Sequence, residues 1–211
     1  MSRTLNLAVL LSGSGRTLEN FQQMISQGHL SARISIVVSS KRGAYGLVRA
    51  QHYGLDAVAI PRKAYDSLEA FNVAINDVLA GYDIDLVVLA GFLSLYHPPP
   101  HLAGNVMNIH PALLPAFGGK GLYGDRVHGA VLEAGVKLSG CTVHFADEQY
   151  DRGPIILQQA VPVEDDDTVE TLAARVFAAE CELYPQAIQL YAEDRLQIEG
   201  RWVRIRPPTL T

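Results

Sequence analysis

Short apolar runs rich in β-branched residues alternate along this chain with longer amphipathic stretches. Alternation of this kind predicts βαβ units and a mostly parallel sheet. Two of the runs, Leu5–Leu11 and Asp85–Ala90, are almost continuously apolar, which is typical of central strands buried on both faces. Further strands are predicted at Arg33–Val38, Ala57–Ile60, Asn105–Ile109, Ser139–Phe145 and Ile155–Val163, with a terminal hairpin over Leu196–Ile205.

Helices are expected between these strands, where apolar residues recur every three or four positions. Their predicted spans are about Thr17–Gln27, Tyr45–His52, Asp66–Leu79, and a long helix that Asp165-Asp166-Asp167-Thr168 opens and that ends near Ala192. The Gly/Pro-rich stretch from Pro111 to Asp125 is expected to be a loop, and a loop of that length is usually functional or mobile. We therefore predict one α/β domain over residues 1–211, with a Rossmann-like, mostly parallel twisted sheet and helices on both faces.

Charge and composition narrow the classes of function. Of the 211 residues, 17 are Lys or Arg and 22 are Asp or Glu, so the formal net charge is −5. An acidic chain without a dense basic tract is a poor candidate for nucleic-acid binding. The apolar runs fall far short of the roughly 18 residues that span a bilayer, so no membrane segment is expected. Cys141 and Cys181 lack a CxxC spacing, which indicates reduced core thiols in a cytoplasmic protein.

The first strand runs into a serine- and glycine-rich loop, Ser12-Gly13-Ser14-Gly15, which a helix follows. Glycine lets a ligand approach the backbone, and the free N–H groups at a helix start attract anions. The loop lacks the third glycine of the dinucleotide fingerprint, because Leu18 takes that position, and it has no Walker lysine. Two alternatives stay open: a tight turn that binds nothing, and an NADP-dependent reductase that holds the 2′-phosphate near Ser39-Ser40-Lys41-Arg42.

The most informative chemistry lies at the end of a later strand, in Asn108-Ile109-His110-Pro111. At the strand period of two, Asn108 and His110 point to one face. An amide beside a group that titrates near neutral pH can polarise a carbonyl and move a proton. Asp151 is a candidate partner that would orient the imidazole and favour its protonated form. Taken alone, an Asn-x-His pattern can also be a surface histidine beside a turn. A metal site made of His144, His110 and Asp151 is a second alternative, but it is disfavoured. His144 is expected to be a supporting group.

Together these segments resemble the folate-dependent phosphoribosylglycinamide formyltransferases of purine synthesis over nearly the whole chain. The resemblance rests on Leu11 through Gly15, Val87 through Phe92, Asn108 through Pro115, Val143-His144-Phe145, Asp151-x-Gly153-Pro154-Ile155-Ile156, and Glu180 with Tyr184-Pro185. The Asn-x-His-Pro-x-Leu-Leu-Pro signature is shared with methionyl-tRNA and sugar formyltransferases, which look longer. The length of this chain therefore favours the glycinamide ribonucleotide enzymes and their formyltransferase fold.

The resemblance implies that the amine of glycinamide ribonucleotide directly attacks the formyl carbon of the co-substrate 10-formyltetrahydrofolate, without a metal. It implies that Asn108 holds the formyl oxygen and that His110, as an imidazolium, stabilises the oxyanion and moves a proton. Asp151 is implied to raise the pKa of His110 and to assist the transfer. The alternatives are a 10-formyltetrahydrofolate hydrolase in which water replaces the amine, an NADP-dependent reductase, and a folate-binding protein without activity.

The resemblance also implies two sets of binding residues. The nucleotide is implied to contact Gly15, Arg16, Thr17 and Glu180. The folate is implied to contact Leu93, Ser94, Leu95, Tyr96, Asn108, Asp147 and Asp151, with Leu68 near its tail. Leu68 and Ser94 stand where arginines are common in the family, so the tail is held more weakly or by Arg62 or Lys63. We expect the nucleotide in about residues 1–100, folate and catalysis in about residues 85–195, and a monomer or homodimer that acts on small molecules.

Overall fold

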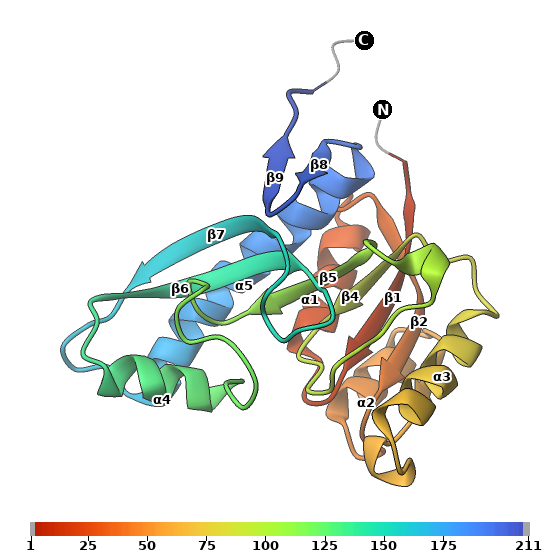
Figure 1. The fold of residues 1–211 in the computed structure, drawn as a ribbon, viewed down its shortest axis with the longest axis horizontal. Coiled ribbons are helices and arrows are strands. Elements are labelled where there is room, and N and C mark those ends of the chain that lie inside the picture. The colour runs from red at the N-terminus through yellow and green to blue at the C-terminus, as the bar shows by residue number, and fades with distance from the viewer. Residues whose placement is uncertain (1–2, 209–211) are drawn as a thin grey trace. The chain divides into compact units, whose positions relative to one another are not determined.

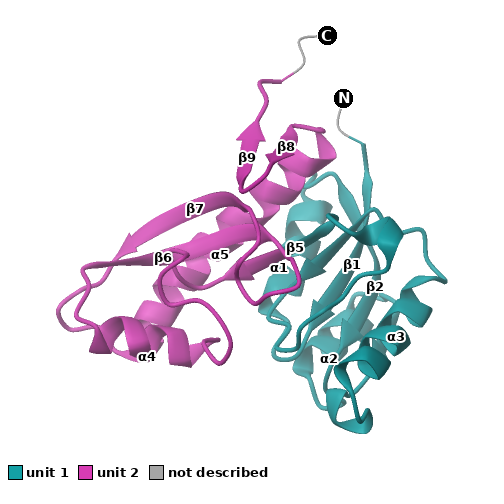
Figure 2. Cartoon of the chain, viewed as in Figure 1, with its two compact units in different colours: residues 1–107 teal, residues 108–211 magenta. Residues whose placement is uncertain are grey.

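The computed structural model describes residues 3–208 and divides the chain into two compact units, Met1–Met107 and Asn108–Thr211 (Figure 2). The boundary falls within one strand, β5 (Val106–His110). Within residues 3–208, none of the helices combines the length and the apolar character needed to span a bilayer. The expectation that the nucleotide binds in about residues 1–100, with folate and catalysis in about residues 85–195, stays a prediction.

The first unit is built on parallel strands joined by helices (Figure 1). Its sheet has the order β3-β2-β1-β4, made of β1 (Leu5–Leu11), β2 (Ala32–Ser39), β3 (Ala57–Ala59) and β4 (Leu86–Leu89). The helices are α1 (Arg16–Ser26), α2 (Tyr45–His52) and α3 (Leu68–Leu79), with short 3₁₀ helices at Arg62–Ala64 and Pro100–Leu102. Because the strands are parallel, their carboxyl ends share one edge of the sheet, where ligands of such folds bind.

Burial explains why these segments form the centre of the sheet. Every residue of β1 and every residue of β4 is buried, so both faces of these strands are covered, as their continuous apolar runs predict. Helix α1 adds Leu18 and Phe21 to this core. Helix α3 begins where the Ser67 hydroxyl accepts a hydrogen bond from the Ala70 N–H, which satisfies one of the unpaired donors of the first turn.

The second unit combines antiparallel strands with one long helix. Its strands β6 (Leu138–Phe145) and β7 (Ile155–Pro162) form an antiparallel pair, and β8 (Leu196–Glu199) and β9 (Trp202–Ile205) form the terminal hairpin. The order is β5-β6-β7-β9-β8, with β7 and β9 parallel. Helix α5 (Val169–Ala192) packs on β6 and β7, and helix α4 (Asp125–Glu133) packs on α5. The predicted terminal hairpin is confirmed, and the sheet is mixed.

Two local features differ from the sequence-based expectation. Helix α4 follows the long loop and was not expected, because its N-cap is Gly124, which has no side chain to cap the first turn. The cap of α5 is Thr168, which exchanges hydrogen bonds with Thr171, and not the aspartates before it. Asp167 instead forms an ion pair with Arg175, at 2.6 Å from Oδ2 to Nη1.

Candidate active site

The second unit brings the three predicted catalytic side chains together. Asn108 and His110 lie at the end of β5, and Asp151 lies in the connection from β6 to β7. Nδ1 of His110 is 3.5 Å from Oδ2 of Asp151. The Nδ2 group of Asn108 donates to Oδ1 of the same carboxylate at 3.4 Å. His110 is 4% exposed, so this chemistry is shielded from bulk water.

The orientation of His110 is fixed from its other side. Its Nε2–H donates to the carbonyl oxygen of Phe117 at 2.8 Å. The nitrogen that faces Asp151 is therefore Nδ1, and in the neutral ring this nitrogen carries the lone pair that can accept a proton. The ring is thus presented to its carboxylate in one defined tautomer.

His144 supports the Asn108 amide, a contact that the spacing of residues alone did not reveal. Its Nδ1–H donates to the carbonyl oxygen of Phe145 at 2.8 Å, which leaves Nε2 as an acceptor. Nε2 accepts from Nδ2 of Asn108 at 3.1 Å and lies 3.6 Å from Oδ1 of Asp151. These bonds orient the amide nitrogen of Asn108 toward the carboxylate.

Burial and neighbouring charges compete at this cluster. Burial lowers the pKa of His110 below its ordinary value, and the charge of Asp151 and the Phe117 carbonyl oppose that shift without cancelling it. Burial raises the pKa of Asp151, but its close contacts with the imidazoles of His144 and His110 and its hydrogen bond from the Gly119 N–H outweigh burial, so the pKa of Asp151 is lowered. Asp151 therefore acts on the pKa of His110 in the implied direction, upward, but burial has the larger effect, so the net pKa of His110 is lowered.

The long loop after β5 packs directly on the carboxylate. The Gly119 N–H donates to Oδ2 of Asp151 at 2.9 Å. A side chain at Gly118 would put a Cβ atom 2.4 Å from a Leu114 methyl carbon and 3.3 Å from Cβ of Asp151. The backbone of Leu114 is held in turn, because its N–H donates to the Thr142 hydroxyl at 3.0 Å. The loop is therefore part of the site and is not a detached connection.

In the first unit, the serine-glycine loop has the form expected of an anion site. Gly15 is the N-cap of α1, with a left-handed φ of 74° and no side-chain cap, so the first N–H groups of the helix are not bonded by a capping side chain. Arg16 is exposed and Thr17 is half-buried at the first turn. Arg49, which the sequence patterns did not single out, donates from Nε to the Ser14 carbonyl at 3.1 Å. Its guanidinium also pairs with Glu19 at 2.5 Å.

The loop depends on a close approach between two helix starts. An added Cβ atom at Gly15 would lie 2.5 Å from Cα of Gly46, and one at Gly46 would lie 2.6 Å from a methyl carbon of Leu11. Gly46 also donates its N–H to the Gly13 carbonyl at 3.1 Å. Gly46 was not among the predicted site residues, because a glycine inside a helix carries no local signal of a contact with a distant loop.

The residues expected to bind folate are spread over both units. In the first unit, Leu93 is 39% exposed, Ser94 and Leu95 are half-buried, and Tyr96 is buried. Leu68 is the first residue of α3 and is half-buried. In the second unit, Asp147 is exposed and its carboxylate accepts from the Gln149 N–H. Glu180 on α5 contributes to raising the pKa of buried Cys141 to about 12, although burial is the main cause.

The two residues offered as substitutes for the missing arginines differ in their surroundings. Arg62 donates to the Tyr65 carbonyl at 2.7 Å, and its guanidinium carbon lies 5.7 Å from the centre of the Phe71 ring. These contacts hold Arg62 against its own segment. Lys63 is exposed. Lys63 is therefore the better candidate of the two for a flexible contact with an acidic tail.

The geometry of the first unit disfavours the reductase alternative. The Ser39 hydroxyl donates to the Lys41 carbonyl at 2.8 Å, and the Ser40 hydroxyl lies 2.6 Å from that of Ser12, where it is buried. Both serines at the end of β2 are thus engaged within the protein, so they do not form an open cradle for a 2′-phosphate. Within residues 3–208, no group of three His, Cys, Asp or Glu side chains is placed to hold a metal ion.

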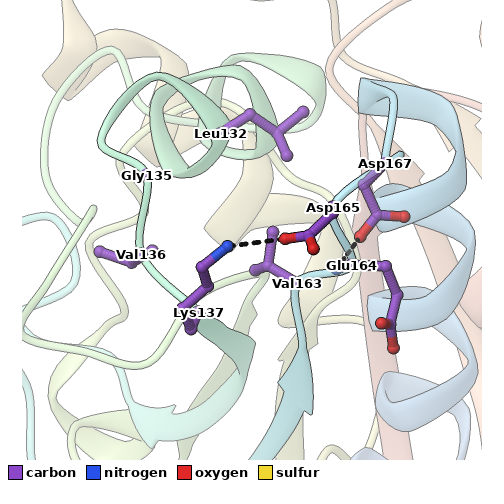
Figure 3. Close-up of a pocket in the computed structure, with 8 residues that line it drawn as sticks. All are labelled: Leu132, Gly135, Val136, Lys137, Val163, Glu164, Asp165 and Asp167. Carbon is purple, nitrogen blue, oxygen red and sulfur yellow. Dashed lines mark hydrogen bonds and ion pairs between the residues drawn. The ribbon is translucent and has the colours of Figure 1, made fainter.

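A separate hollow of about 230 Å³ lies in the second unit, beside the turn after α4 and the segment before α5 (Figure 3). Its charged groups bond to one another: Lys137 donates to Asp165 at 2.8 Å, and Asp167 accepts from the Glu164 N–H. Lys137 and Asp165 are both largely exposed. Because Lys137 and Asp165 pair with each other and are open to solvent, this hollow is not a candidate active site.

Known proteins similar to this chain point to one family of enzymes. The sequence profile described as formyl transferase matches residues 5–188. The trifunctional purine biosynthetic protein adenosine-3 of Gallus gallus is 42% identical over 194 residues, which cover 91% of this chain and 19% of that protein. This chain thus spans about a fifth of the length of such relatives. The chloroplastic phosphoribosylglycinamide formyltransferase of Arabidopsis thaliana is 39% identical and covers 92% of this chain and 68% of its own.

A solved structure extends this similarity to three dimensions. Glycinamide ribonucleotide transformylase 1 from Symbiobacterium toebii is 45% identical and has a TM-score of 0.89 to this chain. The match covers 97% of this chain and 95% of that one. The resemblance seen in the sequence motifs is therefore confirmed in sequence and in fold.

Proposed function

This chain belongs to the formyl transferase family, and we propose that it transfers the formyl group of 10-formyltetrahydrofolate to the amine of glycinamide ribonucleotide in purine synthesis. The observation that carries the proposal is the cluster in which His110 and Asn108 both contact the carboxylate of Asp151. Two of the relatives named above bear formyl transfer to this nucleotide in their names, and each matches this chain over two thirds or more of its own length.

The chemistry begins with attack of the amine nitrogen on the formyl carbon, which forms a C–N bond and a tetrahedral oxyanion. Asn108 donates its amide N–H to the oxyanion, and it gives up its longer bond, the 3.4 Å contact with Asp151, to do so. A donor in this role contributes about 3–4 kcal/mol to transition-state stabilisation. His144 keeps the amide in the donating orientation through the 3.1 Å contact.

Proton movement completes the transfer. His110 starts neutral because of its burial, and its Nδ1 accepts the proton that the attacking amine loses. The Asp151 carboxylate, 3.5 Å away, then stabilises the imidazolium. The C–N10 bond breaks, the carbonyl reforms, and the folate nitrogen takes up the proton that the imidazolium gives up, which returns His110 to its neutral form. Positioned proton transfer contributes about 100- to 10,000-fold to the rate.

The substrates are assigned to the remaining residues. Gly15, Arg16 and Thr17 bind the nucleotide phosphate at the start of α1, and Glu180 binds the ribose hydroxyls. The folate contacts Leu93 through Tyr96, Asp147 and Asp151, with its tail near Leu68. We place the enzyme in the cytoplasm, as a monomer or homodimer that acts on small molecules without a metal.

The test is an assay of formyl transfer from 10-formyltetrahydrofolate with and without glycinamide ribonucleotide. We expect turnover only with the nucleotide, and His110→Ala and Asp151→Asn should lower kcat by at least about 100-fold with little change in nucleotide affinity. His29→Ala and Asp165→Asn, at exposed positions, are the matched controls. Formate release that does not require the nucleotide would instead establish the hydrolase, and near-normal turnover of both site variants would refute the roles.

A further inference from the structure

Helix α3 carries two asparagines on the face that meets the irregular segment 93–97. Asn72 and Asn76 are four residues apart, so they lie on one face of the helix. Asparagine is a poor residue for a helix interior, because its side chain competes for backbone hydrogen bonds. Asn72 is nevertheless 3% exposed in the middle of α3. Because two asparagines occur on the same face of α3 against their low helix propensity, we expect both side chains to make tertiary contacts.

The two amides bond to the backbone and side chains of this segment. Nδ2 of Asn72 donates to the carbonyl oxygen of Leu95 at 3.3 Å, and its Oδ1 accepts from the N–H of His97 at 2.8 Å. Nδ2 of Asn76 donates to the carbonyl oxygen of His97 at 3.1 Å, and its Oδ1 accepts from the Tyr96 hydroxyl at 2.9 Å. These four bonds cover three consecutive residues that have no helix or strand to hold them.

The Tyr96 hydroxyl is committed to this network. The ring is 2% exposed, and burial raises the pKa of the phenol. The segment is tethered at its other end by Ser12, whose hydroxyl accepts from the Leu93 N–H at 2.9 Å. The part from Leu93 to Leu95, of which Leu93 is exposed and the other two residues are half-buried, is thus held at both of its ends.

We propose that Asn72 and Asn76 are positioning residues that set the conformation in which segment 93–96 meets the folate. The inference rests on the proposed function, which assigns that segment to the folate. The asparagines act through the segment's backbone and do not themselves touch substrate. In this chain, where Leu68 and Ser94 replace the expected arginines, folate recognition at this segment depends on backbone shape, and α3 supplies that shape.

The test compares Asn72→Ala and Asn76→Ala with Asn6→Ala. Asn6 is a fair control because it is 7% exposed, lies in the same unit, and bonds to Arg33 at 2.6 Å and to Asp83 at 3.3 Å. Hydrogen exchange of residues 91–98 in the ligand-free protein is measured first. We expect faster exchange there in both α3 variants and unchanged exchange in Asn6→Ala.

Steady-state kinetics provide the second measurement. Loss of a buried hydrogen-bond partner should raise the KM for the folate about 10-fold in each α3 variant, while the KM for the nucleotide and kcat change by less than about 3-fold. Asn6→Ala should change neither KM, although it melts at a lower temperature. If an alanine variant does not fold, Tyr96→Phe removes only one hydroxyl of the network and should raise the folate KM by about 3-fold.

The outcomes separate this inference from the proposed function. A wild-type chain that transfers formyl groups, with α3 variants whose folate KM matches that of Asn6→Ala, overturns the positioning role alone. Equal increases in both KM values overturn it too, because they indicate general destabilisation. A wild-type chain that neither binds the folate nor transfers its formyl group refutes the proposed function, and the assignment of Asn72 and Asn76 to folate binding falls with it.

Discussion

Gly46 is the second residue of α2, and its replacement by alanine offers a test in which two physical effects predict opposite changes in the free energy of unfolding. Replacing glycine by alanine inside a helix ordinarily stabilises the protein by about 0.5–1 kcal/mol. Here the new Cβ atom would lie 2.6 and 2.8 Å from the two methyl carbons of Leu11 and 3.2 Å from Cα of Gly15. Because the nearest atoms belong to a fully buried side chain and a backbone, the steric effect should prevail over helix propensity.

The magnitude follows from both effects. Overpacking of a well-filled core costs about 1–3 kcal/mol. Subtracting the gain in helix propensity from a value near the middle of that range leaves a net loss of stability of about 1 kcal/mol. A loss of this size lowers the Tm of a chain of this length by about 2–4 °C. The serine-glycine loop must shift as well, because Gly46 donates its N–H to the Gly13 carbonyl. We expect the KM for the nucleotide to rise about 10-fold, since a small misplacement of a binding group is costly.

Thermal unfolding and nucleotide kinetics are measured for Gly46→Ala and for Gly43→Ala. Gly43 lies in the segment just before α2, and a Cβ atom added there would meet no atom within 4 Å, so its variant should melt and bind as the wild type does. Leu11→Val removes the clashing methyl carbons. The double variant that combines it with Gly46→Ala should therefore be more stable than the sum of the two single effects predicts. A Gly46→Ala protein that is more stable than the wild type, or a double-variant cycle that is additive, would refute the steric argument.

Three further predictions test the second unit. Because the pKa of His110 is lowered below 6.5, kcat/KM should be level near pH 7 and fall only at lower pH, as the ring becomes protonated; a rise on acidification would contradict the neutral starting form. Gly153→Ala would place a Cβ atom 1.7 Å from the Phe145 carbonyl oxygen, so it should destabilise by more than about 4 kcal/mol and yield no folded protein by circular dichroism, whereas Gly129→Ala should fold. The pKa of Asp167 is lowered mainly by its hydrogen bond with Arg175, so its stabilisation is present above pH 4 and is lost on acidification; Asp167→Asn should lower the Tm at pH 7, and the difference should shrink toward pH 2.

Much of the first unit could be predicted because its strands are buried on both faces. Continuous apolar runs such as Leu5–Leu11 have few alternatives once the flanking helices are recognised, and β1 has these bounds in the structure. Helix α2 likewise matches its predicted span, Tyr45–His52. Helix α4 could not be predicted in the same way, since it lacks a side-chain cap and contains Gly129. The signals that mark a helix start were absent, although tertiary packing on α5 stabilises it.

In the candidate site, too, the features set by neighbouring residues could be predicted from the sequence, and the contacts between distant residues could not. Asn108 and His110 share a face because of strand periodicity, which is a local property. The approach of Asp151, the tautomer that Phe117 imposes and the support from His144 all depend on residues that are distant in sequence. The balance between burial and charge at His110 is likewise a property of the packed structure. The sequence identified the residue and the direction in which Asp151 acts on its pKa, but it could not give the net direction of the pKa shift.

Backbone strain at the site explains how His110 obtains its two partners. Among residues 3–208, Phe117 and Asp151 are two of three non-glycine residues with positive φ, at 54° and 56°. Such a conformation costs about 1–3 kcal/mol per residue and persists where the surroundings demand it. Phe117 places its carbonyl at Nε2, and Asp151 places its carboxylate at Nδ1. The His110 ring lies between two hydrogen-bond acceptors, so it can donate to both of them only when both of its nitrogens carry protons. Burial, in contrast, favours the neutral ring. For the proposed transfer, this opposition suits a histidine that receives a proton as the amine attacks, because the imidazolium then finds both of its partners already in place.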